Sequence, residues 1–589
     1  RQDRYEIVAP PDQAIVQGED WASLTAFHVP SASSNAPTAL ASWNTDEYLM
    51  GLPWGEVYLV QGGSYLRQDW PGTDTVVGLV IRSDSSVWGL DWTGRLCTLQ
   101  GNTWIQETDL HENTGFLGLA LDEQDRLLAY GQSSLLLRET GTGWETVPTD
   151  PDIHFVDAWA APGHGTFLVT SELEVFQLTE EGAELLVRLG QEEFSGHSRI
   201  EGDGSGRLAV CDPNRQQVWV LDGGQWQLIE NGISIQDVFW LDDDLYAIPG
   251  YPGRILRREQ DQWGTVAEFP DHFSTMDIRS LALDGGRFIG CSDAGVLSLS
   301  GGQLGEVSPP LGLVVGLMDL QGRTHALLSK GSHLVSTDMG WQLQGQPLRG
   351  TSPLLPATLK IDQSGRVMFL GQDWITTWDG ITYQKFENQN YQWYDAFYQP
   401  DGSVFLTDYW GQWTLFSGDA FAEVLHYQDD WESLKGVVLE DGGSGWIADD
   451  HRLARLDQGQ TETQLLVQGW RVNGLTHDPV RGAIAHGSGR VLVLADDGFE
   501  DITPWIQGDD DPQGANITSL YPDGQGGLVG WDSEHDLLLY HNSANWVYQA
   551  IPGLYTWWSS IRLSANPDGS FFLWDREINF IHIEPGAGP

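Results

Sequence analysis

Tryptophan recurs at a nearly constant distance before an aspartate in the second half of the chain. The distance is 8 residues from Trp393 to Asp401 and from Trp470 to Asp478. It is 10 residues from Trp431 to Asp441 and from Trp558 to Asp568. An indole ring offers a flat apolar face and one N–H donor, which suits stacking on a sugar ring or gripping a peptide. The predicted ligand-binding residues are therefore these four tryptophans with Tyr394 and Trp410 beside them. The alternative, that the rings fill gaps between packed sheets, stays open.

Two acidic clusters are candidates for calcium binding. Asp509 and Asp511 occupy the first and third positions of a loop that has Gly514 at the sixth, but Leu520 stands where an EF-hand has glutamate. Asp242 and Asp244 belong to a second run of three aspartates. Adjacent carboxylates repel one another unless a cation or water neutralises them, so calcium is the one predicted cofactor. A solvated acidic loop is the alternative at both places.

Sequence motifs of catalysis are missing from the chain. There is no G-x-S-x-G, no H-E-x-x-H and no C-x-x-C, and the acid–histidine groups around His451 and His535 are isolated. The three cysteines, Cys97, Cys211 and Cys291, lie in apolar runs, which predicts buried free thiols. Paired carboxylates for glycoside cleavage cannot be selected from 83 acidic residues. We therefore predict a non-enzymatic protein and keep a polysaccharide lyase or glycoside hydrolase as the alternative.

Charge excludes two classes of partner. The 589 residues contain 83 acidic and 30 basic side chains, which gives a formal charge of −53. Such a surface repels phosphate backbones and anionic headgroups, so we expect no nucleic-acid binding. No apolar run reaches the roughly 20 residues that span a bilayer, so we expect no membrane insertion. The chain starts at Arg1 rather than methionine, which favours a processed, exported protein in the periplasm or outside the cell.

A sequence repeat determines the predicted architecture. G-x-x-W elements recur, as at Gly101–Trp104, Gly141–Trp144 and Gly223–Trp226, and aromatic echoes follow at steps of about 37 to 47 residues. Within one period, residues 76–106 form four short runs rich in β-branched and aromatic residues, separated by Asp, Gly, Ser and Asn. No long amphipathic helical stretch occurs. The chain is therefore predicted to be all-β, with four-stranded blades of a β-propeller.

The chain resembles β-propeller repeat proteins, especially the bacterial two-component-regulator type and WD40-like propellers. The residues that carry this resemblance are the W-x-L-D-x-x-G-R-L segment at Trp88–Leu96 and the G-x-x-W elements. The Gly-His and Trp-Asp dipeptides of true WD40 blades do not recur at fixed places. The resemblance is architectural, and it implies a propeller without implying a particular ligand.

Counting the second strand of each repeat gives fourteen blades, which predicts two tandem seven-bladed propellers. We expect a first propeller over residues 21–308 and a second over 309–589, divided near Pro309-Pro310. The last repeat has only three strand-like runs. Residues 1–20 should therefore supply its fourth strand, with residues 4–9 pairing beside 579–584 to close the second ring.

The expected function follows from these features. We expect an exported binding or scaffold protein that recognises a glycan or a protein partner on the aromatic face of the second propeller. Two alternatives remain: the enzyme named above, acting in a groove between the propellers, and a structural subunit of a larger cell-surface assembly. Because propellers serve many unrelated functions, the architecture does not choose among these.

Overall fold

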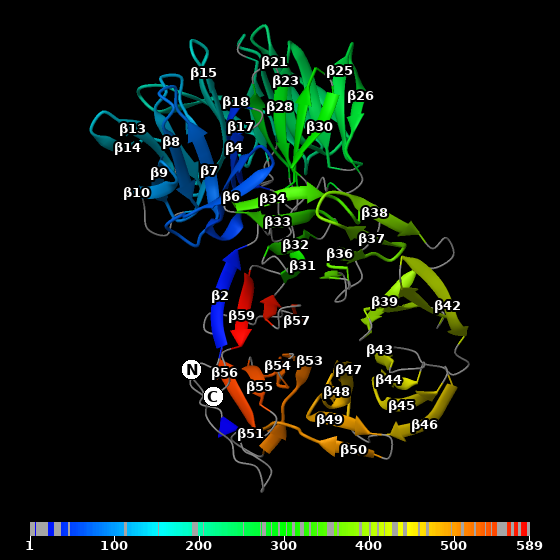
Figure 1. Ribbon diagram of the computed structural model, residues 1–589. Coiled ribbons are helices and arrows are strands. Elements are labelled where there is room, and N and C mark those ends of the chain that lie inside the picture. Colours follow the sequence, from blue (N-terminus) through cyan, green and yellow to red (C-terminus); the bar gives the residue numbers. More distant parts are fainter. Residues whose placement is uncertain are drawn as a thin grey trace. The chain divides into compact units, whose positions relative to one another are not determined.

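The computed structural model describes most of the chain (Figure 1). The described residues are 6–7, 22–28, 37–44, 47–110, 115–150, 152–190, 198–203, 205–250, 252–270, 273, 278–283, 286–291, 295–301, 303–308, 313–318, 323–328, 331–337, 340–349, 359–361, 364–387, 392–399, 402–408, 412–417, 419–426, 434–439, 444–457, 460–466, 470–495, 498–507, 512–523, 526–535, 537–542, 545–550, 562–566, 570–574 and 579–585. The chain divides into two compact units. Unit 1 comprises residues 1–29, 313–336 and 344–589, and unit 2 comprises residues 30–312 and 337–343.

The prediction of an all-β protein is confirmed for the described residues. They form short strands in antiparallel sheets, and their one helical element is the single-turn 3-10 helix η1 (Pro53–Gly55). No helix in this part of the chain has the length and apolar character needed to cross a bilayer. Strands of five or six residues dominate because apolar side chains alternate with glycine, aspartate and serine turns over short intervals.

Unit 2 contains seven four-stranded antiparallel arrays in sequence order, which we number sheets 1 to 7. They span residues 39–68, 76–109, 116–146, 155–188, 199–231, 235–268 and 279–308. The first strands of these sheets are β3 (Ala39–Asn44), β7 (Val76–Ile81), β11 (Phe116–Leu121), β15 (Phe155–Ala161), β19 (Arg199–Gly202), β23 (Ile235–Leu241) and β27 (Arg279–Leu283).

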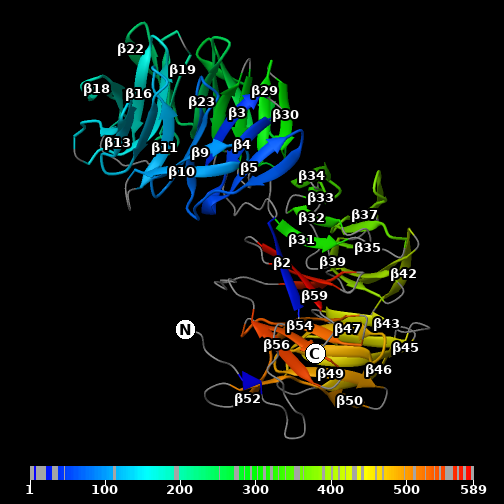
Figure 2. The same cartoon turned by 60° about the vertical axis from the view of Figure 1, so that its left-hand side comes forward.

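First strands of successive sheets lie side by side in unit 2. Contacts join β3 to β7, β7 to β11, β11 to β15, β15 to β19 and β19 to β23, and β27 in turn contacts β3. The last sheet, in green, thus lies against the first, in blue (Figure 2). Tyr48 and Phe288 pack across this junction with ring centroids 5.0 Å apart. We call the first strands of the sheets the inner strands.

The hydrophobic core of each unit is divided into clusters between neighbouring sheets. Between sheets 5 and 6, for example, Cys211 and Val218 pack against Ile235, Val238 and Ala247, and all five are buried. Burial of this kind is the main favourable contribution to folding, and here it also sets the contact between successive sheets. All three cysteines are buried free thiols, as predicted.

Unit 1 contains seven further antiparallel arrays in sequence order, sheets 8 to 14, of which sheet 8 has three strands within the unit and the others have four. These span residues 313–336, 359–387, 393–426, 434–466, 472–501, 517–550 and 562–585. Their inner strands are β31 (Leu313–Met318), β35 (Leu359–Ile361), β39 (Trp393–Tyr398), β43 (Leu434–Leu439), β47 (Val472–Asp478), β53 (Ile517–Pro522) and β57 (Arg562–Ala565). Sheet 14 takes its fourth strand from the start of the chain: β2 (Ala22–His28) pairs with β59 (Asn579–Pro585), as Figure 1 shows in blue and red.

The predicted position of this N-terminal strand was wrong. Glu6 and Ile7, the described part of the predicted strand 4–9, do not pair beside 579–584. Instead β1 (Glu6–Ile7) pairs with β51 (Trp505–Gln507), and β2 pairs with β59 over seven residues from Ala22↔Pro585 to His28↔Asn579. The segment A-S-L-T-A-F-H of β2 alternates polar and apolar residues over a longer run than Tyr5–Ala9, so it provides the longer ladder.

The observed unit boundaries also differ from the predicted ones. The change from unit 1 to unit 2 falls at residues 29 and 30 rather than 20 and 21, and the return falls at 312 and 313 rather than 308 and 309. Residues 337–343 belong to unit 2 as well. There β34 (Gly340–Gly345) pairs through Trp341 and Gln342 with Tyr65 and Ser64 of β6 (Ser64–Gln68).

A recurring interaction holds the tight turns. At the end of a strand, one oxygen of a buried aspartate carboxylate accepts backbone N–H groups two to four residues ahead, and the other oxygen contacts a cationic or imidazole side chain three or four residues ahead. These turn aspartates and their partners are Asp91–Arg95, Asp122–Arg126, Asp203–Arg207, Asp212–Arg215, Asp449–Arg452, Asp478–Arg481 and Asp532–His535.

Asp91 illustrates the geometry of a turn aspartate. Its Oδ1 accepts the Thr93 N–H at 3.1 Å, the Thr93 hydroxyl at 2.8 Å and the Arg95 N–H at 2.9 Å. Arg95 Nη1 donates to Oδ2 at 3.0 Å. The side chain of Asp91 is fully buried and that of Arg95 only partly so. A buried carboxylate is tolerated when hydrogen bonds and a counter-charge replace its water.

Truncation should distinguish the two N-terminal strands. Deleting residues 1–28 removes β2 and leaves β59 as an unpaired edge, so amide protection should fall in sheet 14 and its neighbours in unit 1. Deleting residues 1–20 removes only β1, which pairs through two residues, and should change protection much less. Hydrogen exchange measured by mass spectrometry on both truncations tests this. Equal loss in the two truncations, or loss confined to unit 2, would contradict the assigned pairing.

Removing one turn aspartate should destabilise unit 2. Asp91→Ala leaves the N–H groups of Thr93 and Arg95 without their acceptor in a buried turn, and we expect a loss of about 2–4 kcal/mol in the free energy of unfolding. Asp84→Ala is the matched control because Asp84 is an exposed turn aspartate that accepts a single backbone N–H, from Ser86. Chemical denaturation of both variants checks the difference. Similar midpoints for the two would refute a special role for buried turn aspartates.

Candidate binding site in unit 2

Two of the predicted ligand-binding tryptophans are core residues. Trp393 is 1% exposed and packs among Met368, Leu370 and Val404. Its ring lies 6.0 Å from that of Phe421, at 25°. Trp470 is 3% exposed and packs in the hydrophobic cluster between sheets 11 and 12. Neither ring has a face open to a ligand. Both do what the alternative interpretation expected, namely fill space between sheets.

The other predicted aromatic residues give no test of the binding face. Tyr394 lies in β39, but only its backbone is described. Trp410, Trp431 and Trp558 lie outside the described residues. A shared aromatic surface in the second half of the chain therefore remains a prediction that rests on sequence spacing.

The acidic clusters are described only in part. Asp242 and Asp244 sit in the exposed turn after β23, where Asp242 and Asp243 both have positive φ. Asp243 accepts a hydrogen bond from Arg207 at 3.2 Å, and Asp244 lies 3.6 Å from Arg257. These contacts give the carboxylates cationic partners within the protein. Asp509 and Asp511 lie outside the described residues, and no group of three or more acidic, histidine or cysteine side chains elsewhere in the described part could hold a metal.

A set of buried and half-buried charges lies on the inner strands of unit 2, where sequence analysis predicted no site. We call this set the inner polar cluster: Tyr130, Asp157, Arg199, Glu201, Asp237, Ser280 and Arg287. Five of the seven come from the inner strands β15, β19, β23 and β27. The other two come from second strands, Tyr130 from β12 (Leu127–Gly131) and Arg287 from β28 (Gly286–Gly290).

Two aspartates of the cluster occupy the same position in their sheets. Each follows a register shift in its inner strand, between Phe155 and Asp157 in β15 and between Ile235 and Asp237 in β23. Each accepts the N–H of the next residue, at 3.0 Å and 2.9 Å respectively. Their second oxygens reach the neighbouring sheet: Asp157 accepts the Ile200 N–H at 3.0 Å, and Asp237 accepts the hydroxyl of Ser280.

Arg287 connects three sheets. Its Nη1 and Nη2 donate to the two oxygens of Glu201 at 3.2 and 3.0 Å, and its Nε donates to the Ser280 hydroxyl at 2.9 Å. The guanidinium also lies 4.7 Å from the ring centroid of Phe239. The Arg287 side chain is 3% exposed and that of Glu201 is 21% exposed. This two-point pair therefore fixes the Glu201 carboxylate while leaving part of it open to solvent.

Burial shifts the titration of the cluster. Burial raises the pKa of Asp157 to about 6, and the opposing charge of Arg199 limits the rise. Burial raises the pKa of Tyr130 as well, with the charge of Asp157 adding to the effect. Burial lowers the pKa of Arg287, but the carboxylates of Glu201, Asp237 and Asp157 together outweigh it, so the net shift is upward. The cluster thus contains a carboxyl, that of Asp157, whose pKa lies near neutrality.

The sequence carries a weak signal for this cluster. Aspartate interrupts otherwise apolar inner strands in F-V-D-A-W and I-Q-D-V-F, whereas β7 and β11 have Gly78 and Gly118 at the same position after their register shifts. A side chain at Gly118 would collide with the Tyr130 hydroxyl, and one at Gly78 with Leu119. The repeat thus favours glycine at this position, and an aspartate there stands out.

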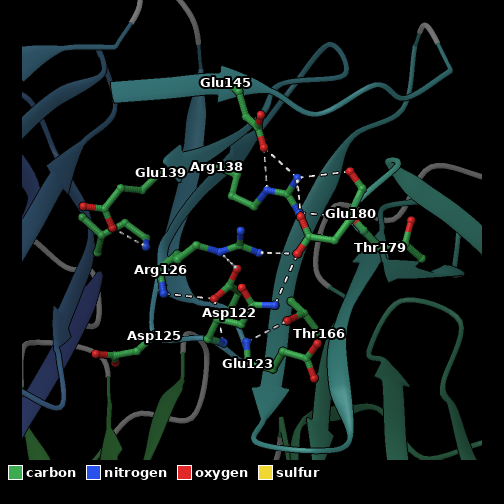
Figure 3. Close-up of polar contacts among 12 residues, drawn as sticks. Asp122, Glu123, Asp125, Arg126, Arg138, Glu139, Glu145, Thr166, Thr179 and Glu180 are labelled. Carbon is green, nitrogen blue, oxygen red and sulfur yellow. Dashed lines mark hydrogen bonds and ion pairs between the residues drawn. The ribbon is translucent and has the colours of Figure 1, made fainter. Parts of the chain in front are cut away.

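A second polar network in unit 2 joins sheet 3 to sheet 4 (Figure 3). Arg126 Nη2 lies 3.2 Å from Glu180 Oε1, and Arg138 Nη1 donates to the Thr179 carbonyl at 3.1 Å. Arg138 Nε also donates to Glu145 at 2.8 Å. Arg126 and then Arg138 lower the pKa of Glu180. Because these cations are paired and Glu180 is largely exposed, the network is best explained as a link between sheets.

Unlike the network around Arg126 and Arg138, the inner polar cluster has charged groups that are able to bind a ligand. Asp157, Arg199 and Glu201 are half-buried, so a ligand can reach acceptors of negative charge and donors of positive charge within one region. Among the described residues, the hydrogen bond recorded for Arg199 runs from Nη1 to the Ser198 carbonyl at 3.1 Å, and no carboxylate lies within 4.0 Å of its guanidinium. Arg199 thus retains donors for a ligand. Groups held in place before binding lose little entropy when a ligand arrives.

Comparison with known proteins adds little. No family model and no curated protein matches the chain. Among solved structures, the extracellular domain of a putative hybrid two-component system from B. thetaiotaomicron aligns with a TM-score of 0.37 and 10% identity. The alignment covers 94% of this chain and 82% of that chain. A similarity of this size carries neither fold nor function from one protein to the other.

The two units should respond oppositely to acid. In unit 1, burial lowers the pKa of His486 and of His541 to about 4. The unfolded chain binds their protons near pH 6.5, so unit 1 loses stability as the pH falls from about 6.5 towards 4. In unit 2, burial raises the pKa of Glu56 to about 7 and that of Asp157 to about 6. Protonation favours their folded forms, so unit 2 gains stability as the pH falls from about 7.

Hydrogen exchange at pH 7 and pH 5, corrected for intrinsic exchange rates, measures this difference within one molecule. Each buried histidine should cost unit 1 roughly 1–2 kcal/mol at pH 5. Protonation of surface carboxylates relieves charge repulsion in both units, so the quantity to compare is the change in protection of unit 1 relative to that of unit 2. His486→Gln should reduce the acid sensitivity of unit 1 and leave unit 2 unchanged. A parallel shift of both units would show that these buried groups do not set the pH response.

Proposed function

We propose that each unit is a seven-bladed β-propeller and that the protein is a non-enzymatic glycan-binding protein. The proposal of two rings draws on the side-by-side inner strands, on the contact of β27 with β3 in unit 2, and on the contact of β31 with β58 (Phe571–Trp574) in unit 1. The strand β2, which comes from the start of the chain, would then close the ring of unit 1.

One observation carries the proposed binding site: a two-point Arg287–Glu201 pair holds a carboxylate beside the half-buried Asp157 and Arg199. Placing four charged side chains on inner strands, with the charged Arg287 on the adjoining strand β28, costs stability compared with apolar packing. Charged groups with shifted pKa values that gather in one region are typical of functional sites. We therefore assign ligand recognition to the inner polar cluster.

The chemistry of the cluster favours a sugar. Each sugar hydroxyl both donates and accepts hydrogen bonds, so it matches a site that offers carboxylates, guanidinium groups and hydroxyls together. Half-buried side chains on inner strands can meet a narrow ligand more easily than the flat surface of a folded partner. The predicted aromatic residues Trp410, Trp431 and Trp558 remain a second proposed contact surface, in unit 1.

A glycan array with the intact protein tests the proposal. Arg199→Gln removes the guanidinium whose N–H donors are available to a ligand. We expect binding to the same glycans to weaken by about tenfold or more. Arg188→Gln is the matched control: Arg188 is a strongly exposed arginine paired with Glu174 outside the cluster, and its loss should leave binding unchanged. Equal binding by the wild type and Arg199→Gln would refute this site. A blank array would refute glycan recognition.

Further arms of the same experiment test the alternatives. Loss of binding in a chelator would support calcium at Asp509 and Asp511 or at Asp242 and Asp244. Release of shorter products from the bound polysaccharide would favour an enzyme, with Asp157 as the candidate acid because its pKa lies near 6. A stable complex with another surface protein, without glycan binding, would favour a structural subunit. Export is part of the proposal, and fractionation of cells that produce the tagged protein tests it.

A further inference from the structure

Lysine is scarce in this chain, and one lysine lacks the usual partner. The sequence has four lysines: Lys330, Lys360, Lys385 and Lys435. Lys385 Nζ lies 2.7 Å from Glu387, and Lys435 Nζ lies 3.4 Å from Asp450. Among the described residues, no carboxylate lies within ion-pair distance of Lys360, although the chain has 83 acidic side chains. Lys360 therefore occupies a different environment from the other two described lysines.

Lys360 contacts an aromatic ring. Its Nζ lies 4.0 Å from the ring centroid of Tyr398. Lys360 is on the inner strand β35 of sheet 9, opposite Met368, and Tyr398 ends the inner strand β39 of sheet 10. Both side chains are half-buried, so part of each remains open to solvent. A ring face attracts an ammonium group much less than a buried carboxylate does, and leaves the amine freer to lose its proton.

A third inner strand contributes to this environment. The electrostatic influence of Tyr521, from β53 of sheet 13, acts on Tyr398, whose pKa is raised mainly by burial and further by Tyr521. Tyr521 therefore lies near enough to Tyr398 to act on its hydroxyl, and the raised pKa keeps Tyr398 uncharged at neutral pH. Among the described residues, the amine of Lys360 thus faces the ring of Tyr398 and has no carboxylate within ion-pair distance.

We propose that Lys360 is a covalent binding site for small neutral aldehydes and ketones, which it holds as imines. The lone pair of the neutral amine attacks the carbonyl carbon and forms the C–N bond, while the oxygen takes up a proton to give a carbinolamine. Loss of the hydroxyl group as water, with the remaining nitrogen proton, gives the C=N bond. Amine and carbonyl compound yield imine and water, with no change of oxidation state.

Two further observations agree with this assignment. Burial lowers the pKa of Lys360 to about 8, so about one fifth of the amine is neutral at pH 7.4, against about 0.1% for an ordinary lysine. The net charge of −53 repels anionic carbonyl compounds such as α-keto acids. Neutral carbonyl compounds with a flat apolar part, able to pack on Tyr398, should be preferred.

Reductive trapping on the intact protein tests the proposal. Benzaldehyde and cyanoborohydride are added at pH 7.5 for short times, and each lysine is followed by peptide mapping. Lys360 should be modified at least tenfold faster than Lys385 and Lys435, with a rate that levels off above pH 8. Glyoxylate, an anionic aldehyde, should show a smaller preference for Lys360. Equal rates at the three lysines, or no modification of Lys360, would overturn the proposal.

Two controls keep the result independent of any unstable variant. In urea-unfolded protein the preference for Lys360 should disappear, because the ring contact and the burial are lost. A preference that survives unfolding would assign the reactivity to local sequence and overturn the structural argument. Lys360→Arg, which retains the positive charge, should lose modification at that position and leave the rates at Lys385 and Lys435 unchanged. This site lies in unit 1, so its success or failure is independent of the glycan site proposed in unit 2.

Discussion

The buried carboxylate that ends a strand and holds its own turn is the interaction on which both units depend. A sheet of strands five or six residues long has nearly as many turns as strands, and each turn exposes backbone N–H groups that need acceptors. Asp91, Asp212 and Asp532 supply such acceptors with fully buried side chains. The cation or imidazole three or four residues later balances the charge, which explains why an acidic protein keeps arginine in its turns. Without these contacts the strands would lack fixed ends, and the clusters between sheets would lack fixed spacing.

The inner strands use one position in two ways. At some of these positions glycine makes room for a large side chain, as Gly78 does for Leu119 of the neighbouring sheet and Gly118 for Tyr130 of its own sheet. Where space remains, Asp157 and Asp237 use the same geometry to bond the neighbouring sheet. The cluster around Arg287 is therefore a variation of the repeat, in which aspartate replaces glycine at the position after the register shift. A binding site can arise in this way without any change in the architecture that surrounds it.

The sequence predicted the class of fold well and the site poorly, for physical reasons. Strand length, turn residues and the recurrence of G-x-x-W are local properties, so the all-β fold could be predicted from them. The pairing partner of β59 could not, because Tyr5–Ala9 and Ala22–His28 are both plausible strands and only long-range packing selects β2. Trp393 and Trp470 were predicted to face a ligand but are buried, because spacing determines where a ring lies along the strand but not whether a neighbouring sheet covers it. Asp157 and Arg287 come together from sheets far apart in the chain, which no local pattern reveals.

The pairing of β2 with β59 also has a consequence for synthesis. His28 and Asn579, which face each other in the ladder, are 551 positions apart in the chain. At typical ribosomal rates of about 5 to 20 residues per second, β2 waits roughly half a minute to two minutes for its partner. Unit 2 needs nothing beyond residue 343 and can fold during that interval. Throughout it, β2 is an unpaired strand able to pair with other chains. The edge of β59 and the strand that covers it thus meet only after the intervening 550 residues have been made.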